Sequence, residues 1–200
     1  MEVRSGMRLY LVRHGETDWN IENRIQGQTD TELNEKGRQQ ADKLAGELVR
    51  GYQIKKIYAS GKARAWETAN IIGRELGIKP KRKEGLEEIS FGKWEGYTWK
   101  QVKETFPEEY LVWQKNRRYQ VPPMGESYQQ LLVRLLPALD DIIQEGGEDT
   151  LAVTHSAVIM TLMSYLYDTP FEDMARNYRT GNAGIVELDQ ELFYQRYAGK

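Results

Sequence analysis

The chain alternates short apolar runs with amphipathic stretches, and this alternation limits the folds open to it. Three apolar runs have the length of a buried β-strand: Leu9 to Val12, Ile54 to Ala59 and Thr150 to Thr154. Apolar residues at helical spacing occur after these runs and predict helices there. Strands separated by helices pair in parallel, with helices on both faces of the sheet. We therefore expect an α/β fold, a three-layer sandwich around a mostly parallel sheet flanked by helices.

Four long helices and several less regular segments complete the expected fold. The helices are predicted over Asn34 to Gly51, Lys62 to Leu76, Ser127 to Gln144 and Ala157 to Tyr167. Pro137 lies inside the third of them and predicts a kink. Pro80 favours an edge strand or a loop over Ile78 to Lys83. Near the end of the chain, Ile185 to Leu188 and Leu192 to Tyr197 predict a terminal hairpin or two edge strands.

Residues 91–125 interrupt this alternation. They are rich in aromatic side chains, namely Trp94, Tyr97, Trp99, Phe106, Tyr110, Trp113 and Tyr119. We expect a small helical cap over the sheet, and the alternative is that these aromatics only fill the core of an insertion. A chain of 200 residues, 40% of them hydrophobic, can bury one good core. Residues 1–200 are therefore expected to form a single domain that carries the cap as an insertion.

Composition excludes several classes of function. The 28 basic and 30 acidic residues give a formal net charge of -2, which offers no general attraction to nucleic acid or to an anionic membrane. The absence of cysteine excludes disulfides, thiolate zinc sites and a cysteine nucleophile. No stretch reaches the ~18 apolar residues of a membrane span. Residues 1–6 are polar, unlike a signal peptide, and are set aside as a leader or a cloning scar. We expect a cytoplasmic protein.

Both histidines of the chain stand directly after predicted strands. His14 follows the strand at Leu9 to Val12, and His155 follows the strand near residue 153. Ligands of open α/β sheets bind beyond the carboxyl ends of the strands, so both imidazoles are expected to face one crevice. Arg13 precedes His14, and Arg64 lies in the opening turns of a helix, where exposed backbone N–H groups also favour anions. These residues predict an anion pocket in an otherwise nearly neutral protein.

The residues around His14 resemble a known family signature. The run Leu11-Val12-Arg13-His14-Gly15-Glu16-Thr17, with Trp19-Asn20, resembles the signature of the histidine phosphatase (phosphoglycerate mutase-like) superfamily, in its broad-specificity phosphatase branch. Further motifs of the family recur in order: Ala59-Ser60, Arg64-Ala65, Thr68-Ala69, Leu86-Glu87-Glu88, Phe91-Gly92-Lys93-Trp94-Glu95-Gly96, Gly125-Glu126-Ser127 and Val153-Thr154-His155. The resemblance covers nearly the whole chain.

The resemblance implies roles for the matching residues around the phosphoryl group. His14 would be the nucleophile and form a phosphohistidine, since a neutral imidazole is available near pH 7. Arg13, Arg64 and His155 would bind the nonbridging oxygens and stabilise their charge. The residues expected to contact the substrate are Arg13, Asn20, Gln26, Gly27, Arg64 and Ser156. Ser156 stands where the family usually has glycine, and we expect it to alter the pocket only slightly.

A carboxylic acid opposite the nucleophile would protonate the leaving group. The family pattern has this acid two residues after a leucine, here Leu86, which favours Glu88 over Glu87. Glu88 would then activate water as the carboxylate. A nearby phosphate dianion would raise its pKa and keep it protonated while substrate is bound. No metal and no cofactor are expected, since two histidines and scattered acids do not supply a two-metal site.

The resemblance implies a metal-independent phosphomonoester hydrolase that acts on a small phosphorylated metabolite. An α-ribazole phosphatase and a cofactor-dependent phosphoglycerate mutase are alternatives. Lys100 and Arg117-Arg118 resemble basic positions of mutases, but Gly125-Glu126-Ser127 follows almost at once, whereas mutases carry a long insertion there. A non-enzymatic phosphate-binding module is the alternative from another class. No basic stripe for a nucleic acid is present, and a homodimer is left open.

Overall fold

A single sheet forms the centre of the computed structural model, which describes residues 7–198. Residues 1–6, set aside above, lie outside this range. The strands of the sheet are β1 (Leu9–Arg13), β2 (Lys56–Ala59), β3 (Lys81–Arg82), β4 (Thr150–Thr154) and β5 (Ile185–Glu187). Their order is β3-β2-β4-β1-β5; β5 pairs antiparallel with β1, and the other pairs are parallel. The predicted mostly parallel sheet is confirmed.

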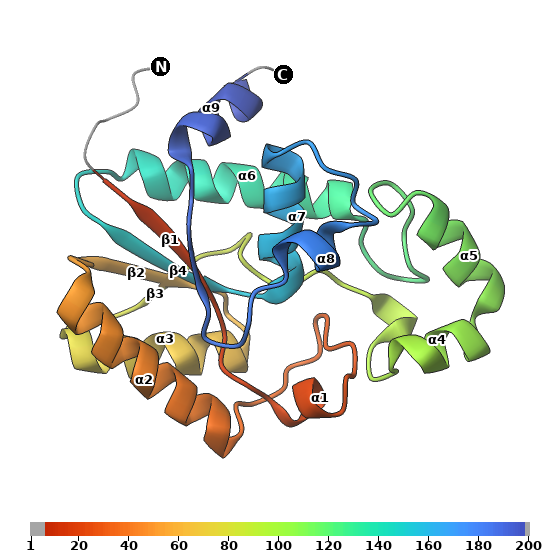
Figure 1. Cartoon of the computed structure of the whole chain (residues 1–200), viewed down its shortest axis with the longest axis horizontal. Helices are drawn as coiled ribbons and strands as arrows, with labels where there is room; N and C mark the ends of the chain where they lie inside the picture. Colours follow the sequence, from red (N-terminus) through yellow and green to blue (C-terminus); the bar gives the residue numbers. More distant parts are fainter. Residues whose placement is uncertain (1–6, 199–200) are drawn as a thin grey trace.

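Helices cover both faces of this sheet, because alternate residues of each strand face opposite sides (Figure 1). Tyr10 and Val12 of β1 pack in one hydrophobic cluster with α2 (Glu35–Gly51) and α3 (Ala63–Leu76). Leu9 and Leu11 pack in the other, with α6 (Tyr128–Gln144) and α7 (Ser156–Leu166). The three layers are confirmed. Helix α6 continues through Pro137.

The end of the chain differs from the prediction. Ile185–Glu187 forms the expected edge strand, but Gln190–Ala198 forms helix α9 and not a second strand. The Asp189 side chain accepts a hydrogen bond from Leu192 N and begins the helix. Phe193 has no exposed surface, and its ring lies 5.4 Å from that of Tyr197, one helical turn later. The aromatic residues that favoured a strand are thus spaced to bury one face of a helix.

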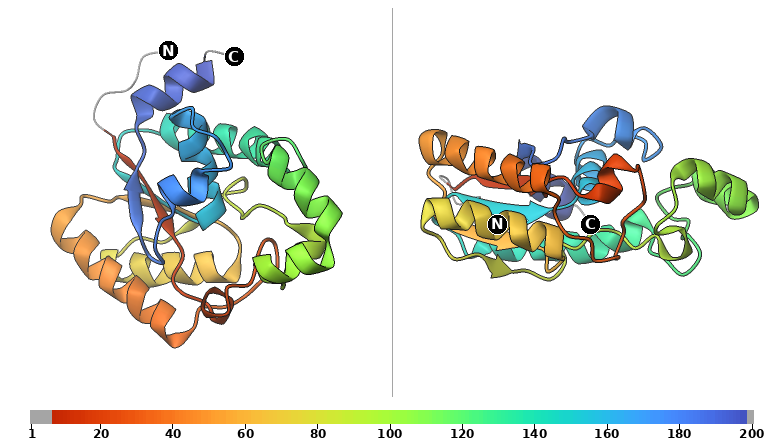
Figure 2. Two further views of the ribbon diagram at one scale, coloured as in Figure 1. Left: turned by 45° about the vertical axis from the view of Figure 1, so that its right-hand side comes forward. Right: turned by 90° about the horizontal axis from the view of Figure 1, so that it is seen from below.

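The segment after β3 extends beyond the sheet. It contains the 3-10 turn η1 (Gly92–Trp94) and helices α4 (Trp99–Thr105) and α5 (Pro107–Lys115). Figure 2 shows α4 and α5 standing past the carboxyl ends of the strands and not over a face of the sheet. We call residues 91–125 the cap. Two short helices, α1 (Asp18–Ile21) and α8 (Met174–Tyr178), were not predicted and lie on the same side of the molecule.

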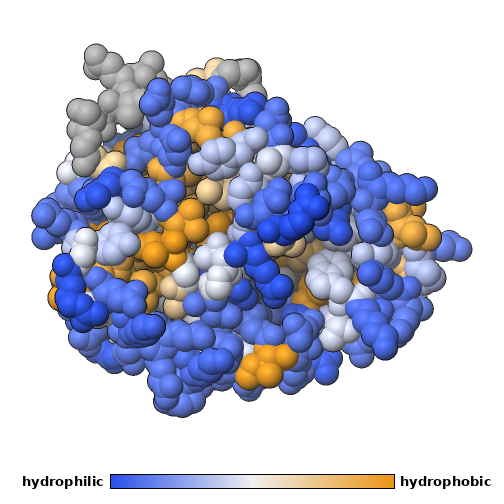
Figure 3. Space-filling view, in the orientation of Figure 1, coloured by the Kyte–Doolittle hydropathy of each residue, from blue (hydrophilic) through white to orange (hydrophobic). Residues whose placement is uncertain are grey.

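The surface seen in Figure 3 is mainly hydrophilic, with separate apolar areas. Within residues 7–198, no helix has the length and apolar character needed to cross a membrane.

Backbone packing against the start of α2 fixes the segment that follows β1. A Cβ atom on Gly37, in the first turn of α2, would lie 2.1 Å from the Glu16 carbonyl oxygen. A Cβ atom on Gly15 would lie 2.4 Å from the Gly37 carbonyl oxygen. Asn34 begins the helix by accepting a hydrogen bond from Gly37 N, and its own N–H donates to Glu16 O. The two glycines therefore let α2 approach the residue after His14 directly.

Replacing Gly37 by alanine is expected to lower the free energy of unfolding by about 1–3 kcal/mol, because the added methyl group meets backbone that cannot move aside. Gly46→Ala in the same helix is the matched control, since the nearest atom to its Cβ is the flexible end of Arg50, at 3.5 Å. That control should raise the stability by about 0.4–1 kcal/mol. Urea unfolding measures both, and equal stability of the two variants would contradict the close packing.

Candidate active site

A cavity of about 540 Å³ opens at the carboxyl ends of β1 and β4, between the cap, α1 and α8. Its wall includes Arg13, His14, Arg64 and Glu88. A second cavity of about 620 Å³ lies near α9, but none of these four residues lines it. Within residues 7–198, no three His, Cys, Asp or Glu side chains are grouped as a metal site would require. We therefore describe the first cavity as the candidate active site.

His14 has a defined tautomer at the end of β1. The backbone N–H of His14 donates to Thr154 O of β4, which fixes the backbone at the strand end. The ring Nδ1 lies 2.7 Å from the carbonyl oxygen of Gly15, and a carbonyl can only accept, so Nδ1 carries the hydrogen. Burial, and then the charges of Arg64 and Arg13, hold the pKa of His14 well below 6.5. The ring is therefore neutral, with a lone pair on Nε2.

Two buried arginines stand beside His14. Arg64 has no exposed surface, and its Nη1 and Nη2 donate to Thr29 O and Gly27 O, each at 2.8 Å. Arg13 Nη1 donates to Thr180 O at 2.7 Å. Both Nε atoms are buried without a hydrogen-bond partner among the described residues. Burial lowers the pKa of both guanidinium groups, while the nearby Glu88 opposes this. Among the described residues, no carboxylate forms an ion pair with either of these two guanidinium groups, so they contribute positive charge to the cavity wall.

His155 is the residue directly before helix α7 and lies behind His14. The two ring centroids are 5.2 Å apart, as expected for histidines at adjacent strand ends. His155 differs from the prediction in having no exposed surface, and it does not line the cavity. Its Nε2 lies 2.8 Å from Ser60 Oγ, which holds the ring toward β2, and its Nδ1 has no partner among the described residues. Burial and the charge of Arg64 hold its pKa well below 6.5.

The structure separates Glu88 from its neighbour Glu87. Glu88 lines the cavity, and its two carboxylate oxygens accept from Ile89 N at 3.0 Å and Ala157 N at 3.3 Å. Burial raises its pKa, and the charges of Arg64 and Arg13 oppose the rise. The Glu87 side chain instead accepts from Gly85 N, with Arg134 at 3.8 Å, and does not line the cavity. Glu88 is therefore the carboxyl group able to act on a ligand.

The remaining predicted contact residues all line the cavity. The Asn20 side-chain oxygen accepts from Thr17 N and from Asn182 Nδ2, which holds the amide in one orientation. The Gln26 side-chain oxygen accepts from Thr31 Oγ1. Ser156 is the first residue of α7, one residue before the predicted start of this helix at Ala157.

Gly27 contributes through its backbone. Its φ of +52° and a Cβ that would lie 2.2 Å from Glu95 Oε1 explain the glycine, and its carbonyl oxygen holds Arg64. The Glu95 carboxylate accepts hydrogen bonds from Gln28 N, from Thr29 N and Oγ1, and from Phe91 N. One carboxylate thus joins the loop that holds Arg64 to the first residue of the cap.

Arg179 and Asn182 are two of the cavity residues that were missed from the sequence. Arg179 lines the cavity and adds positive charge that lowers the pKa of Arg13. Asn182 donates to the carbonyl oxygen of His14 at 3.3 Å and to Asn20 at 3.0 Å. Both stand shortly before β5, and β5 runs antiparallel to β1. The residues just before such an edge strand lie beside the end of β1. Their place before the predicted strand at Ile185 is the sequence signal that could have identified them.

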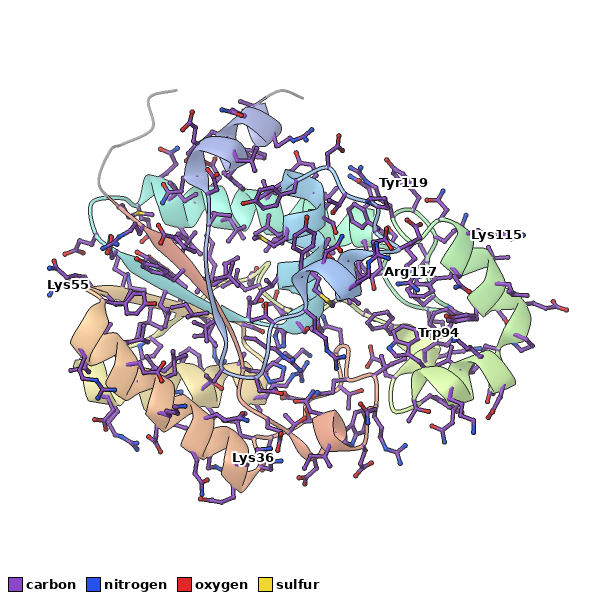
Figure 4. All side chains as sticks on the ribbon, viewed as in Figure 1. Lys36, Lys55, Trp94, Lys115, Arg117 and Tyr119 are labelled. Atoms are coloured by element: carbon purple, nitrogen blue, oxygen red, sulfur yellow. The ribbon has the colours of Figure 1, made fainter. Side chains whose placement is uncertain are left out.

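The cap supplies the opposite wall, with Phe91, Trp99, Tyr110 and Trp113. Trp94 is fully buried and does not line the cavity. Some aromatic residues of the cap thus face the cavity, as the cap prediction implies, while Trp94 fills the core, as the alternative implies. Figure 4 shows Arg117, itself a residue of the cap, between helices α5 and α8. Its guanidinium lies 4.7 Å from the Trp113 ring centroid, and its Nε has no partner among the described residues.

The other basic residues of the cap have different surroundings. Lys100 is exposed beside Glu104 and does not line the cavity. Arg118 lines the second cavity, where its Nε donates to Gln129. Lys103, which was not predicted, does line the candidate site. Of the three basic residues that resemble mutase positions, only Arg117 therefore reaches the cavity.

Known proteins resemble the chain over most of its length. The sequence pattern of the Histidine phosphatase superfamily (branch 1) matches residues 9–195. Phosphoglycerate mutase-like protein 4 of Arabidopsis thaliana is 38% identical over 157 residues, which cover 77% of this chain and 68% of that protein. Glucosyl-3-phosphoglycerate phosphatase of Mycobacterium tuberculosis is 32% identical over 190 residues, which cover 90% and 84%.

Solved structures agree with this relationship. The structure of YhfR from Bacillus stearothermophilus has a TM-score of 0.83 at 34% identity and covers 92% of this chain and 91% of its own. The predicted fold and the predicted enzyme class, a phosphatase, are confirmed at the level of the family. With a match that extends from β1 into α9 and includes every strand of the sheet, the chain belongs to the histidine phosphatase superfamily, branch 1.

Proposed function

We propose that the protein is a phosphomonoester hydrolase that transfers the phosphoryl group of a small metabolite first to His14 and then to water. The observation that carries this proposal is the buried His14 ring, whose Nδ1–H donates to Gly15 O while its Nε2 keeps a lone pair. Arg13, Arg64 and Glu88 line the same cavity. A neutral nucleophile, two cations and a protonated acid are the groups that phosphoryl transfer to a side chain needs.

In the first step, the Nε2 lone pair attacks phosphorus and the ester P–O bond breaks. The leaving oxygen takes the proton of Glu88, whose raised pKa favours the protonated form. The product is a phosphohistidine with a positive ring, and the Gly15 carbonyl oxygen stabilises that charge through Nδ1–H. In the second step, the Glu88 carboxylate takes a proton from water while the water oxygen attacks phosphorus. The P–N bond breaks, and inorganic phosphate leaves.

The two arginines supply the electrostatic stabilisation. Their Nη groups are held by backbone carbonyl oxygens, so the guanidinium planes are fixed before substrate binds. Their buried Nε–H groups have no partner among the described residues and are among the donors left for nonbridging oxygens. Charges fixed in a site of low dielectric stabilise a developing anion more strongly than the same charges in water.

A mutase is the second candidate, favoured by one observation. Arg117 lines the cavity with an unpartnered Nε and could bind a second acidic group of a substrate. Lys100 and Arg118, the other two basic residues of that pattern, do not line it, which supports hydrolysis. The Mycobacterium tuberculosis relative is likewise named a phosphatase. A panel of phosphomonoesters, with a mutase assay beside it, separates the two reactions and identifies the substrate.

The neutral state of the two histidines can be titrated directly. Burial and the charge of Arg64 should keep both rings unprotonated at pH 6.5 and somewhat below it. Ring nitrogen NMR from pH 8 downward measures this, and His155→Asn assigns the signals of a chain with two histidines. Because the unfolded chain takes up these protons at higher pH than the folded protein, the free energy of unfolding should fall as the pH drops below 6.5. A ring that is half protonated at pH 6.5 or above contradicts this assignment.

Replacing His14 by asparagine should lower kcat for p-nitrophenyl phosphate by at least about 10³-fold, because the attacking lone pair is lost. The assay is run in EDTA. Rapid quenching with radiolabelled phosphomonoester should trap a phosphoenzyme in the wild type that is stable to alkali and labile to acid. Substantial turnover by the variant would refute attack by His14. Phosphate binding by the wild type without any turnover would favour the binding module.

Replacing Glu88 by glutamine should lower kcat/KM, which reports the first step alone, far more for alkyl phosphates than for p-nitrophenyl phosphate, whose leaving group needs little protonation. The loss of activity at high pH should also disappear, since in the wild type activity falls as the pH rises through the raised pKa of Glu88. Glu87→Gln, which does not alter the cavity wall, is the matched control. Equal losses on both classes of substrate would remove Glu88 from the role of general acid.

A further inference from the structure

Ser60 is a buried hydroxyl group that the steps above do not use. It follows β2 directly, and it has no exposed surface. Its N–H donates to Val153 O of β4, which fixes its backbone at the strand end beside His155. Its Oγ lies 2.8 Å from His155 Nε2 and accepts a hydrogen bond from Lys62 N at 3.3 Å. The hydroxyl therefore stands between a backbone donor and an imidazole.

The hydrogen atoms of this contact can be arranged in two ways. If Nε2 carries the ring hydrogen, it donates to Ser60 Oγ, which then accepts twice, and the hydroxyl hydrogen has no acceptor among the bonds of the described residues. If Nδ1 carries it, the Ser60 hydroxyl donates to the Nε2 lone pair, and Oγ still accepts from Lys62 N. A buried hydroxyl without an acceptor costs about 1–3 kcal/mol. The second arrangement satisfies every hydrogen of Ser60 and leaves only the His155 Nδ1–H without a partner among the described residues, whereas the first leaves both the hydroxyl hydrogen and the Nδ1 lone pair unpartnered.

We propose that Ser60 is a positioning residue that holds His155 as the Nδ1–H tautomer, so that this N–H donates to a phosphoryl group on His14. The two rings are adjacent, with centroids 5.2 Å apart, and Nδ1 of His155 is a buried polar atom with no partner among the described residues. A phosphoryl group on His14 brings acceptor oxygens to that neighbourhood. The part played by the donor rests on the proposed function, whereas the tautomer itself does not.

The contrast between the two histidines supports this assignment. Both rings carry their hydrogen on Nδ1, but the ring nitrogen that a protein hydrogen bond holds is Nδ1 in His14 and Nε2 in His155. In His14 the Gly15 carbonyl holds Nδ1–H and leaves Nε2 as a lone pair. In His155 the Ser60 hydroxyl holds Nε2 and leaves Nδ1–H as a donor. Because burial keeps His155 neutral, it has one N–H to offer, and the hydroxyl decides which nitrogen carries it.

Ring nitrogen NMR tests the tautomer in the resting protein. Only His14 and His155 contribute, so a chain labelled at histidine gives four ring nitrogens. We expect both rings of the wild type as Nδ1–H tautomers, with His155→Ala assigning the signals. In Ser60→Ala, the His155 signals should shift toward the Nε2–H form and the His14 signals should stay. A wild-type His155 in the Nε2–H form overturns the proposal and needs no variant of Ser60.

Kinetics separate positioning from structural support. Ser60→Ala should lower kcat for p-nitrophenyl phosphate by about 10²-fold, because one preorganised donor is lost, with little change in KM. Ser60→Thr, which keeps the hydroxyl, should restore both kcat and the tautomer. In a His155→Ala background, Ser60→Ala should have no further effect on kcat, and an equal loss in both backgrounds overturns the proposal. If the wild type has no phosphatase activity, the proposed function fails while the NMR experiment still decides the tautomer.

Discussion

Two guanidinium groups are held inside the protein by backbone carbonyl oxygens, and the surrounding site depends on that arrangement. Arg13 binds the carbonyl of Thr180, and Arg64 binds those of Thr29 and Gly27. Buried charges are costly unless they are paired, and here the partners are neutral dipoles. The positive field is therefore not cancelled by a carboxylate in contact. It favours neutral histidines and an anionic ligand in the cavity.

The same burial acts in opposite directions on the titratable groups of the cavity. It lowers the pKa of His14 and raises that of Glu88, so both are driven toward their uncharged forms. The site therefore contains a base that keeps its lone pair and an acid that keeps its proton. Hydrogen bonds then assign the detail: Gly15 O selects the nitrogen of His14 that keeps its lone pair, and Ile89 N and Ala157 N hold the Glu88 carboxyl group.

Much of this arrangement could be predicted from the sequence, because it follows from strand ends. In a parallel sheet the carboxyl ends of strands meet at one edge, so Arg13, His14 and the start of α3 had to lie together. The complete burial of His155 outside the cavity wall could not be predicted, since a place at a strand end does not say how much of the ring faces the crevice. Helix α9 was mistaken for a strand because aromatic residues satisfy both periods, and only burial against the core decides between them.

The loop that holds Arg64 and the cap that faces it share one carboxylate, Glu95. Its oxygens bind Gln28 and Thr29 on one side and Phe91 on the other. These four hydrogen bonds tie the two segments together at one side chain. The loop that Glu95 holds also supplies the Thr29 and Gly27 carbonyl oxygens that orient the Arg64 guanidinium group. In the proposed reaction, the fit of a leaving group against the cap would therefore bear on how Arg64 holds the phosphoryl group.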